Sequence, residues 1–155
     1  MQKQNYWHKV LLLVFCFSCW GCGKTYETSI PHVSFNFSCN LAQSPYYKIT
    51  IAGQFLAIQK NINGLRVGYG GLIIGRSIYS NDNSYLAYDA ACPVEAKADV
   101  SLTVKDDGLG TAVCPHCGAS FDLSNYGCRN DGKGSEVLRK YNSVIVNGNT
   151  LVVRN

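Results

Sequence analysis

Two short cysteine segments hold the residues of this sequence whose types and spacing could do chemistry. The first begins with Cys92 and Pro93, and the second runs Cys-Pro-His-Cys from Cys114 to Cys117. Thiolates are ligands of zinc and of iron–sulfur centres, and paired thiols form disulfides in oxidising compartments. These segments therefore predict either a metal centre or a disulfide between two loops.

The Cys-x2-Cys spacing of Cys114 and Cys117 has two further interpretations. It supplies half of a tetrahedral zinc site, which Cys92 with Cys128 or His116 would complete. The same spacing occurs in thiol–disulfide exchange, where it lowers a thiol pKa. That redox motif normally lies at a helix N-terminus, whereas the residues that follow here favour a strand, so we disfavour thiol exchange.

The rest of the chain predicts short β-strands that would position these loops. Apolar residues alternate with polar ones, and the Asn147-Gly148 pair between β-branched runs is a strong hairpin signal. Sustained helical periodicity is not found after the leader. We therefore predict an all-β fold, an antiparallel barrel or sandwich of about ten short strands. The expected strands are 30–41, 47–51, 54–58, 65–74, 85–89, 100–104, 111–113, 120–123, 143–146 and 151–153.

The N-terminus predicts export and lipid anchoring. A basic start precedes an apolar run, 10–17, which is shorter than a spanning helix needs. Cys22 then follows a glycine, as in the processing site of bacterial lipoproteins, so we expect a lipidated protein of the bacterial cell envelope. Cys19 is a second candidate for lipidation, and a plain secretory signal is the alternative. The expected division is a signal peptide over 1–22, a tether over 23–31 and one β domain over 32–155.

The cysteine count limits the possible disulfides. The chain has eight cysteines, of which two leave with the leader and Cys22 carries lipid. The remaining number is odd, so these cysteines cannot all pair within one chain. Cys39 shares an apolar stripe with Phe35 and Phe37, and we expect it to be a buried structural thiol. The cysteines of the mature domain are Cys39, Cys92, Cys114, Cys117 and Cys128.

The charge of the chain argues against a nucleic-acid partner. The formal net charge is +4 at pH 7, and it falls to about +2 without the leader. A balance this mild does not indicate binding to a polyanion.

The segment from Cys114 to Asp122, with Cys92 upstream, resembles the Rieske iron–sulfur domain. That family holds a [2Fe–2S] cluster between a Cys-x-His loop and a Cys-x-x-His loop, the second often reading Cys-Pro-x-His-Gly-x-x-Phe-Asp. The resemblance implies a Rieske-like β domain with Cys92 and Cys114 as thiolate ligands. Val94 stands at the first histidine position and Cys117 at the second, so both expected histidines are replaced.

These replacements leave the cofactor open. A modified [2Fe–2S] cluster would use Cys92, Cys114 and Cys117 with a fourth ligand, and zinc could occupy the same cysteines. Without any cofactor, a disulfide from Cys92 to Cys114 or Cys117 would lock the loops. The candidates for the fourth ligand are Cys128, His116 and Glu95, although Glu95 and Asp99 also fit solvated loop charges.

Together these features predict an exported, membrane-tethered, Rieske-like protein that transfers electrons through a [2Fe–2S] cluster to an envelope partner of unknown identity. The alternative is a cluster-free, disulfide-stabilised scaffold or binding module, or a zinc-bound variant. A stand-alone enzyme is not indicated, because no nucleophile with catalytic partners is evident in the sequence.

Overall fold

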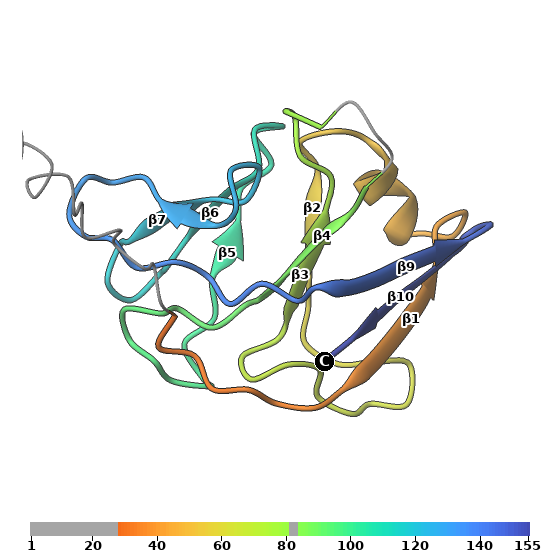
Figure 1. The fold of residues 1–155 in the computed structure, drawn as a ribbon, viewed down its shortest axis with the longest axis horizontal. Coiled ribbons are helices and arrows are strands. Elements are labelled where there is room, and N and C mark those ends of the chain that lie inside the picture. Colours follow the sequence, from red (N-terminus) through yellow and green to blue (C-terminus); the bar gives the residue numbers. More distant parts are fainter. Residues whose placement is uncertain (1–27, 81–83) are drawn as a thin grey trace, which may run out of the picture.

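The computed structural model describes residues 28–80 and 84–155, and in this part of the chain nearly all regular structure is β-strand (Figure 1). Every pairing between named strands is antiparallel. The strands form three small sheets with the orders β1-β10-β9, β2-β3-β4 and β5-β6-β7-β8. The predicted all-β, antiparallel class with short strands is therefore confirmed. No helix within the described ranges is long and apolar enough to cross a membrane.

The first sheet joins the two ends of the domain. Strand β1 (Asn36–Asn40) pairs with β10 (Thr150–Arg154), which pairs with β9 (Ser143–Asn147). The β9–β10 turn contains Gly148 with φ +56°, a left-handed conformation that glycine adopts without strain. The predicted C-terminal hairpin is thus confirmed, and Figure 1 shows it beside the strand that opens the described domain.

The second and third sheets carry the cysteine segments. The second contains β2 (Phe55–Ile58), β3 (Leu72–Gly75) and β4 (Leu86–Asp89). The strands of the third are β5 (Thr103–Val104), β6 (Thr111–Val113), β7 (Ser120–Asp122) and β8 (Cys128–Arg129).

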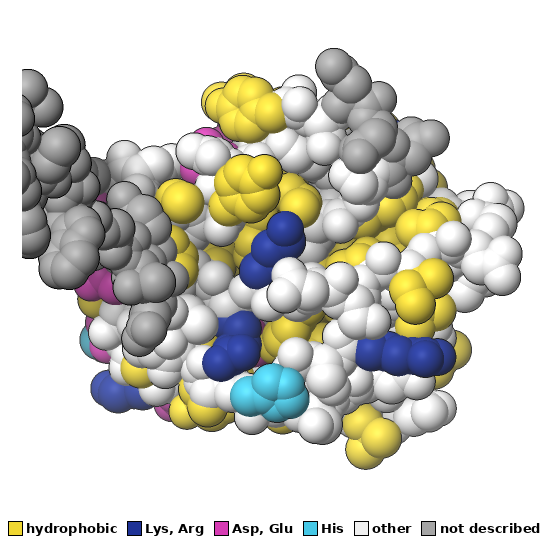
Figure 2. All heavy atoms as spheres, viewed as in Figure 1, with side chains coloured by type: hydrophobic (Ala, Val, Ile, Leu, Met, Phe, Trp, Pro, Cys, Tyr) yellow, Lys and Arg dark blue, Asp and Glu magenta, His cyan; other side chains and the backbone are white. Residues whose placement is uncertain are grey.

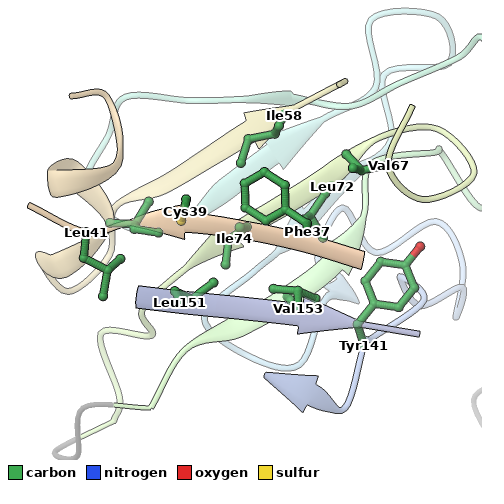
Figure 3. Close-up of a cluster of buried hydrophobic side chains, with 12 residues drawn as sticks. Phe37, Cys39, Leu41, Ile58, Val67, Leu72, Ile74, Tyr141, Leu151 and Val153 are labelled. Carbon is green, nitrogen blue, oxygen red and sulfur yellow. The ribbon is translucent and has the colours of Figure 1, made fainter. Parts of the chain in front are cut away.

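Strand β3 separates two hydrophobic clusters. Leu72 and Ile74 pack into one cluster and Ile73 into the other, and none of the three is exposed. Because successive side chains of a strand point to opposite faces, a strand that is covered on both sides has a continuous apolar sequence. Figure 3 shows the first cluster, in which Phe37 of β1 and Val153 of β10 lie beside Leu72.

Several predicted elements differ from the structure. The segment 47–51 alternates like a strand but forms a 3-10 helix, Tyr46–Thr50, in which the Thr50 hydroxyl donates to the Tyr47 carbonyl at 2.7 Å. Only Ile49 of this helix is buried, so there is no strand face to cover. The long segments 30–41 and 65–74 shorten to β1 and β3, and 100–104 shortens to β5. Strand β8 lies in a region where a loop was predicted.

The described residues that are visible in Figure 2 form no continuous basic patch. On this face, lysine and arginine side chains lie singly among neutral and apolar groups.

The start of β2 depends on a close approach that only glycine permits. A Cβ on Gly53 would lie 1.9 Å from the Gly108 carbonyl oxygen, and Gly53 has φ +80°. We expect Gly53→Ala to lower the free energy of unfolding by about 3 kcal/mol, from overpacking and backbone strain together. Urea denaturation measures this loss. The matched control is Gly64→Ala, because Gly64 has φ +76° with nothing within 4 Å. Equal losses in the two variants would contradict the steric explanation.

Candidate metal centre

The first cysteine loop follows β4 and is closed by backbone hydrogen bonds. The Cys92 N–H donates to the Val100 carbonyl at 2.9 Å, and the Leu102 N–H donates to the Ala90 carbonyl at 2.7 Å. These bonds hold the end of the loop next to its start, just before β5 begins. The loop is therefore held between the second and third sheets.

The second cysteine loop connects β6 to β7. The Cys114 N–H donates to the Ala119 carbonyl at 2.9 Å, which closes the turn between the two strands. Because β5 continues from the first loop and pairs with β6, the β5–β6 hairpin brings the second loop back to the first.

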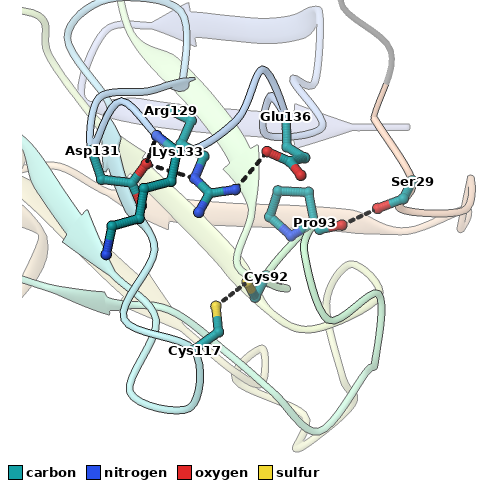
Figure 4. A network of polar contacts seen from close by, with 8 residues as sticks. All are labelled: Ser29, Cys92, Pro93, Cys117, Arg129, Asp131, Lys133 and Glu136. Carbon is teal, nitrogen blue, oxygen red and sulfur yellow. Dashed lines mark hydrogen bonds and ion pairs between the residues drawn. The ribbon is translucent and has the colours of Figure 1, made fainter.

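Three sulfur atoms meet where these loops approach each other. The Sγ atoms of Cys92, Cys114 and Cys117 all lie within 4.8 Å of one another. The Cys92 and Cys117 sulfurs are 3.7 Å apart (Figure 4). Cys92 and Cys114 are buried and Cys117 is exposed, and all three are free thiols. Within the described residues this is the one group of His, Cys, Asp or Glu side chains close enough together to hold a metal ion.

The two buried thiols differ in acidity. Burial raises the pKa of Cys92 to about 12, against the opposing effect of the Glu95 and Val94 backbone N–H groups. Burial also acts to raise the pKa of Cys114. It is outweighed by the backbone N–H groups of Cys117 and His116 and by the neighbouring thiols, so the Cys114 pKa lies below its ordinary value. Negative charge in this group is therefore best accommodated on Cys114.

The candidate fourth ligands lie outside the sulfur group. The His116 Nδ1 atom contacts the Glu95 Oε1 atom at 2.9 Å, and the exposed fractions of the two side chains are 64% and 17%. Cys128 lies in β8 and is partly buried. Cys39, predicted to be a structural thiol, is buried in the cluster around Phe37, and burial raises its pKa to about 11.

The residues present do not fit a cluster with two histidine ligands. Val94 has no donor atom, and the ring of His116 is exposed and engaged by Glu95. One pair of sulfurs instead has the separation expected around a single metal ion, and the third sulfur lies within 4.8 Å of both. Zinc–sulfur bonds of about 2.3 Å in a tetrahedron place two sulfurs about 3.8 Å apart. The separation of Cys92 and Cys117 is 3.7 Å.

A buried carboxylate that sequence reasoning missed fixes the start of the first loop. Asp89 is fully buried, and its Oδ1 atom accepts hydrogen bonds from the N–H groups of Gly70 at 2.9 Å and Ala91 at 2.8 Å. Its Oδ2 atom accepts from the Tyr69 N–H at 2.6 Å and from the Tyr141 hydroxyl. Burial and the Asp89 carboxylate raise the pKa of Tyr141. Three of these four donors lie 19 or more residues away in the sequence, so no local pattern indicates them.

The glycine-rich loop after β8 is braced by ion pairs. Arg129 Nε contacts Asp131 at 2.8 Å and its Nη1 atom contacts Glu136 at 2.7 Å (Figure 4). Hydrogen bonding to Arg129 holds the pKa values of both carboxyl groups below their ordinary values.

Comparisons with known proteins show likeness only in solved structures. No family model matches the chain, and neither does any curated protein sequence. A ferredoxin of Sphingomonas yanoikuyae B1 gives a TM-score of 0.47 at 17% identity, over 79% of this chain and 99% of that chain. The ferredoxin of carbazole 1,9a-dioxygenase from Nocardioides aromaticivorans IC177 gives 0.45 at 18% identity, over 79% and 97%. A putative nitrite reductase NADPH small subunit gives 0.40 at 14% identity, over 79% and 98%. The site is therefore interpreted from its own geometry.

Proposed function

We propose that this chain is an electron-transfer protein whose iron centre is held between the two loops by Cys92, Cys114 and Cys117. The observation that carries the proposal is the convergence of the three sulfurs within 4.8 Å. Iron in thiolate coordination exchanges single electrons, and its potential depends on ligand type and solvent exposure. Two ligands are buried and the third, Cys117, is exposed, so the centre would be shielded on one side and accessible to a partner on the other.

We also propose that the protein acts at a membrane of the bacterial cell envelope. Cys22 and the rest of residues 1–27 lie outside the described residues, so the signal peptide and lipidation remain predictions. The Ser29 hydroxyl donates to the Pro93 carbonyl in the first cysteine loop (Figure 4). Six residues lie between Cys22 and Ser29, so the two positions can be at most about 25 Å apart. A lipid on Cys22 would therefore keep the centre close to the bilayer, which favours a partner in the same membrane.

Metal analysis of anaerobically purified protein tests the iron centre. We expect about one iron per chain if the site holds a single ion, and visible absorption that bleaches reversibly on reduction. Equal iron and sulfide at two per chain would instead identify the [2Fe–2S] form that the Rieske resemblance implies. A folded, colourless protein that contains zinc or no metal would contradict electron transfer.

A cluster-free scaffold is the second candidate, and the 3.7 Å contact between Cys92 and Cys117 favours it. A small movement of the loops would allow these thiols to form a disulfide in an oxidising envelope. Peptide mapping without reductant distinguishes the two functions. A Cys92–Cys117 crosslink in metal-free protein supports the scaffold, and three free thiols in that protein exclude it.

A further inference from the structure

The two cysteine loops share one sequence pattern. The first reads Cys-Pro-Val-Glu from Cys92 to Glu95, and the second reads Cys-Pro-His-Cys from Cys114 to Cys117. Each begins with a buried cysteine followed by proline, and each has a side chain capable of binding a metal three residues after that cysteine.

The backbone of the two loops follows the same turn. The Ala96 N–H donates to the Cys92 carbonyl at 2.9 Å, and the Gly118 N–H donates to the Cys114 carbonyl at 3.0 Å. Both fifth residues are left-handed, with φ +52° for Ala96 and +73° for Gly118. The hydrogen bond and the left-handed residue thus occur at the same position of each turn.

Although the pKa values of the two first thiols differ, backbone N–H groups act on both of them. The Val94 and Glu95 N–H groups hydrogen-bond to the Cys92 thiol. In the second loop, the N–H groups of His116 and Cys117 hydrogen-bond to the Cys114 thiol. Backbone N–H donors favour the charged form of a sulfur ligand. Residues 92–96 and 114–118 therefore form the same kind of turn around their first cysteine.

The first turn contains a residue with a strained backbone. The left-handed conformation costs a non-glycine residue about 1 kcal/mol of conformational energy. Ala96 bears this cost, whereas Gly118, which has no Cβ, does not. A strained backbone persists where its surroundings require it, and such positions gather at functional sites. Glu95 directly precedes Ala96, as Cys117 directly precedes Gly118. Glu95 therefore has the same position in the first turn that Cys117 has in the second.

We propose that Glu95 is the fourth ligand of a single metal ion bound by Cys92, Cys114 and Cys117. Carboxylate oxygen is an established ligand of zinc and of other divalent ions. The side chain is mostly buried, and its carboxylate reaches the second loop, where it contacts His116. Glu95 lies outside the 4.8 Å sulfur group, so ligation requires rotation of its side chain away from the His116 ring. Partly exposed pairs of this kind contribute little stability and are readily exchanged.

A single ion also agrees with the spacing of the sulfurs. A two-iron cluster divides its four protein ligands between two metals, so ligands on different irons lie farther apart than ligands on one. Here all three sulfurs lie within 4.8 Å. This inference rests on the proposed metal centre but does not depend on which metal occupies it.

Cobalt substitution of the full protein tests Glu95. The protein is purified anaerobically, stripped with a chelator and titrated with Co²⁺, whose thiolate charge-transfer band reports the number of bound sulfurs. We expect Glu95→Cys to increase this band by about one third, from three thiolates to four. Glu95→Gln should weaken Co²⁺ binding at least about tenfold, because a charged ligand is lost. The matched control is Asp99→Asn, which removes a carboxylate from the same loop at an exposed position and should leave affinity unchanged.

A variant of His116 separates Glu95 from the histidine as the fourth ligand. His116→Ala should leave Co²⁺ affinity equal or higher, because it releases the Glu95 carboxylate. Loss of binding in His116→Ala with retention in Glu95→Gln would identify the histidine as the ligand and overturn the inference. An unchanged band in a folded Glu95→Cys variant would overturn it as well.

The results that would contradict Glu95 as a ligand differ from those that would contradict electron transfer. Native protein that contains zinc and shows no redox activity would end the electron-transfer proposal and leave the Glu95 results standing. Native protein with two irons and two sulfides, unaffected by Glu95→Gln, would retain electron transfer and exclude the single-ion site.

Discussion

Cys92→Ala is expected to reduce bound metal from about one ion per chain to less than a tenth of that value, because it removes one of the three sulfurs on which the site depends. Metal bound to the native state stabilises it by mass action, by about 4 kcal/mol when free metal exceeds the dissociation constant a thousandfold. The variant should therefore lose both the metal and the rise in Tm that metal addition gives the parent protein. Metal analysis and thermal unfolding with and without chelator measure these effects.

Cys39→Ala is the matched control for this variant. It also removes a buried free thiol, but from the hydrophobic cluster around Phe37. We expect it to cost about 1 kcal/mol of stability and to leave metal content unchanged. If both variants retain metal equally, the three-sulfur group is not the binding site.

Asp89→Asn is expected to lower the free energy of unfolding by about 3–5 kcal/mol, since it breaks a buried and fully hydrogen-bonded charge. Each carboxylate oxygen of Asp89 accepts two hydrogen bonds. An amide nitrogen in place of either oxygen would face two donors. Because the Ala91 N–H is one of these donors, metal affinity at the neighbouring Cys92 should fall in the same variant. Urea unfolding and metal titration measure the two losses.

Tyr141→Phe provides the comparison for Asp89. It removes one donor to the carboxylate and keeps the ring, which is buried and contacts Phe35 edge-on. We expect a loss of about 1.5–3 kcal/mol from this change, as for other hydrogen bonds to charged groups. The loss in the double variant should be smaller than the sum of the two single losses, because the partners interact directly. Strict additivity would show that the Asp89–Tyr141 hydrogen bond contributes nothing.

The strands could be predicted from sequence where alternation coincides with burial. Phe37 and Cys39 alternate with exposed neighbours in β1, and the Asn147-Gly148 hairpin forms as expected. The segment 47–51 alternates equally well but turns into a 3-10 helix, because its hydrogen bonds are local and only Ile49 finds a place in the core. The pattern of residues alone does not show whether a neighbouring strand is available for the segment to pair with.

The candidate site could be predicted only in part. The spacing of Cys92, Cys114 and Cys117 indicated a shared site, and the three sulfurs do meet. Asp89 was not foreseen, because three of its four donors, at positions 69, 70 and 141, become its neighbours only after folding. The sequence places Glu95 and Cys117 alike, three residues after a cysteine, but it does not show that the two loops form the same turn. The shared turn shows in the left-handed backbone of Ala96, a conformation that an alanine in sequence does not suggest.

The approach of Cys92 and Cys117 also has a consequence for the unfolded chain. A disulfide between them would enclose the 25-residue separation that contains β5 and β6. Restricting a loop of that length lowers the entropy of the denatured ensemble by an amount worth about 3.5 kcal/mol of folding stability. A metal ion that leaves on unfolding imposes no such restriction and stabilises the folded state by mass action instead, so a disulfide and a bound metal would act on opposite sides of the folding equilibrium.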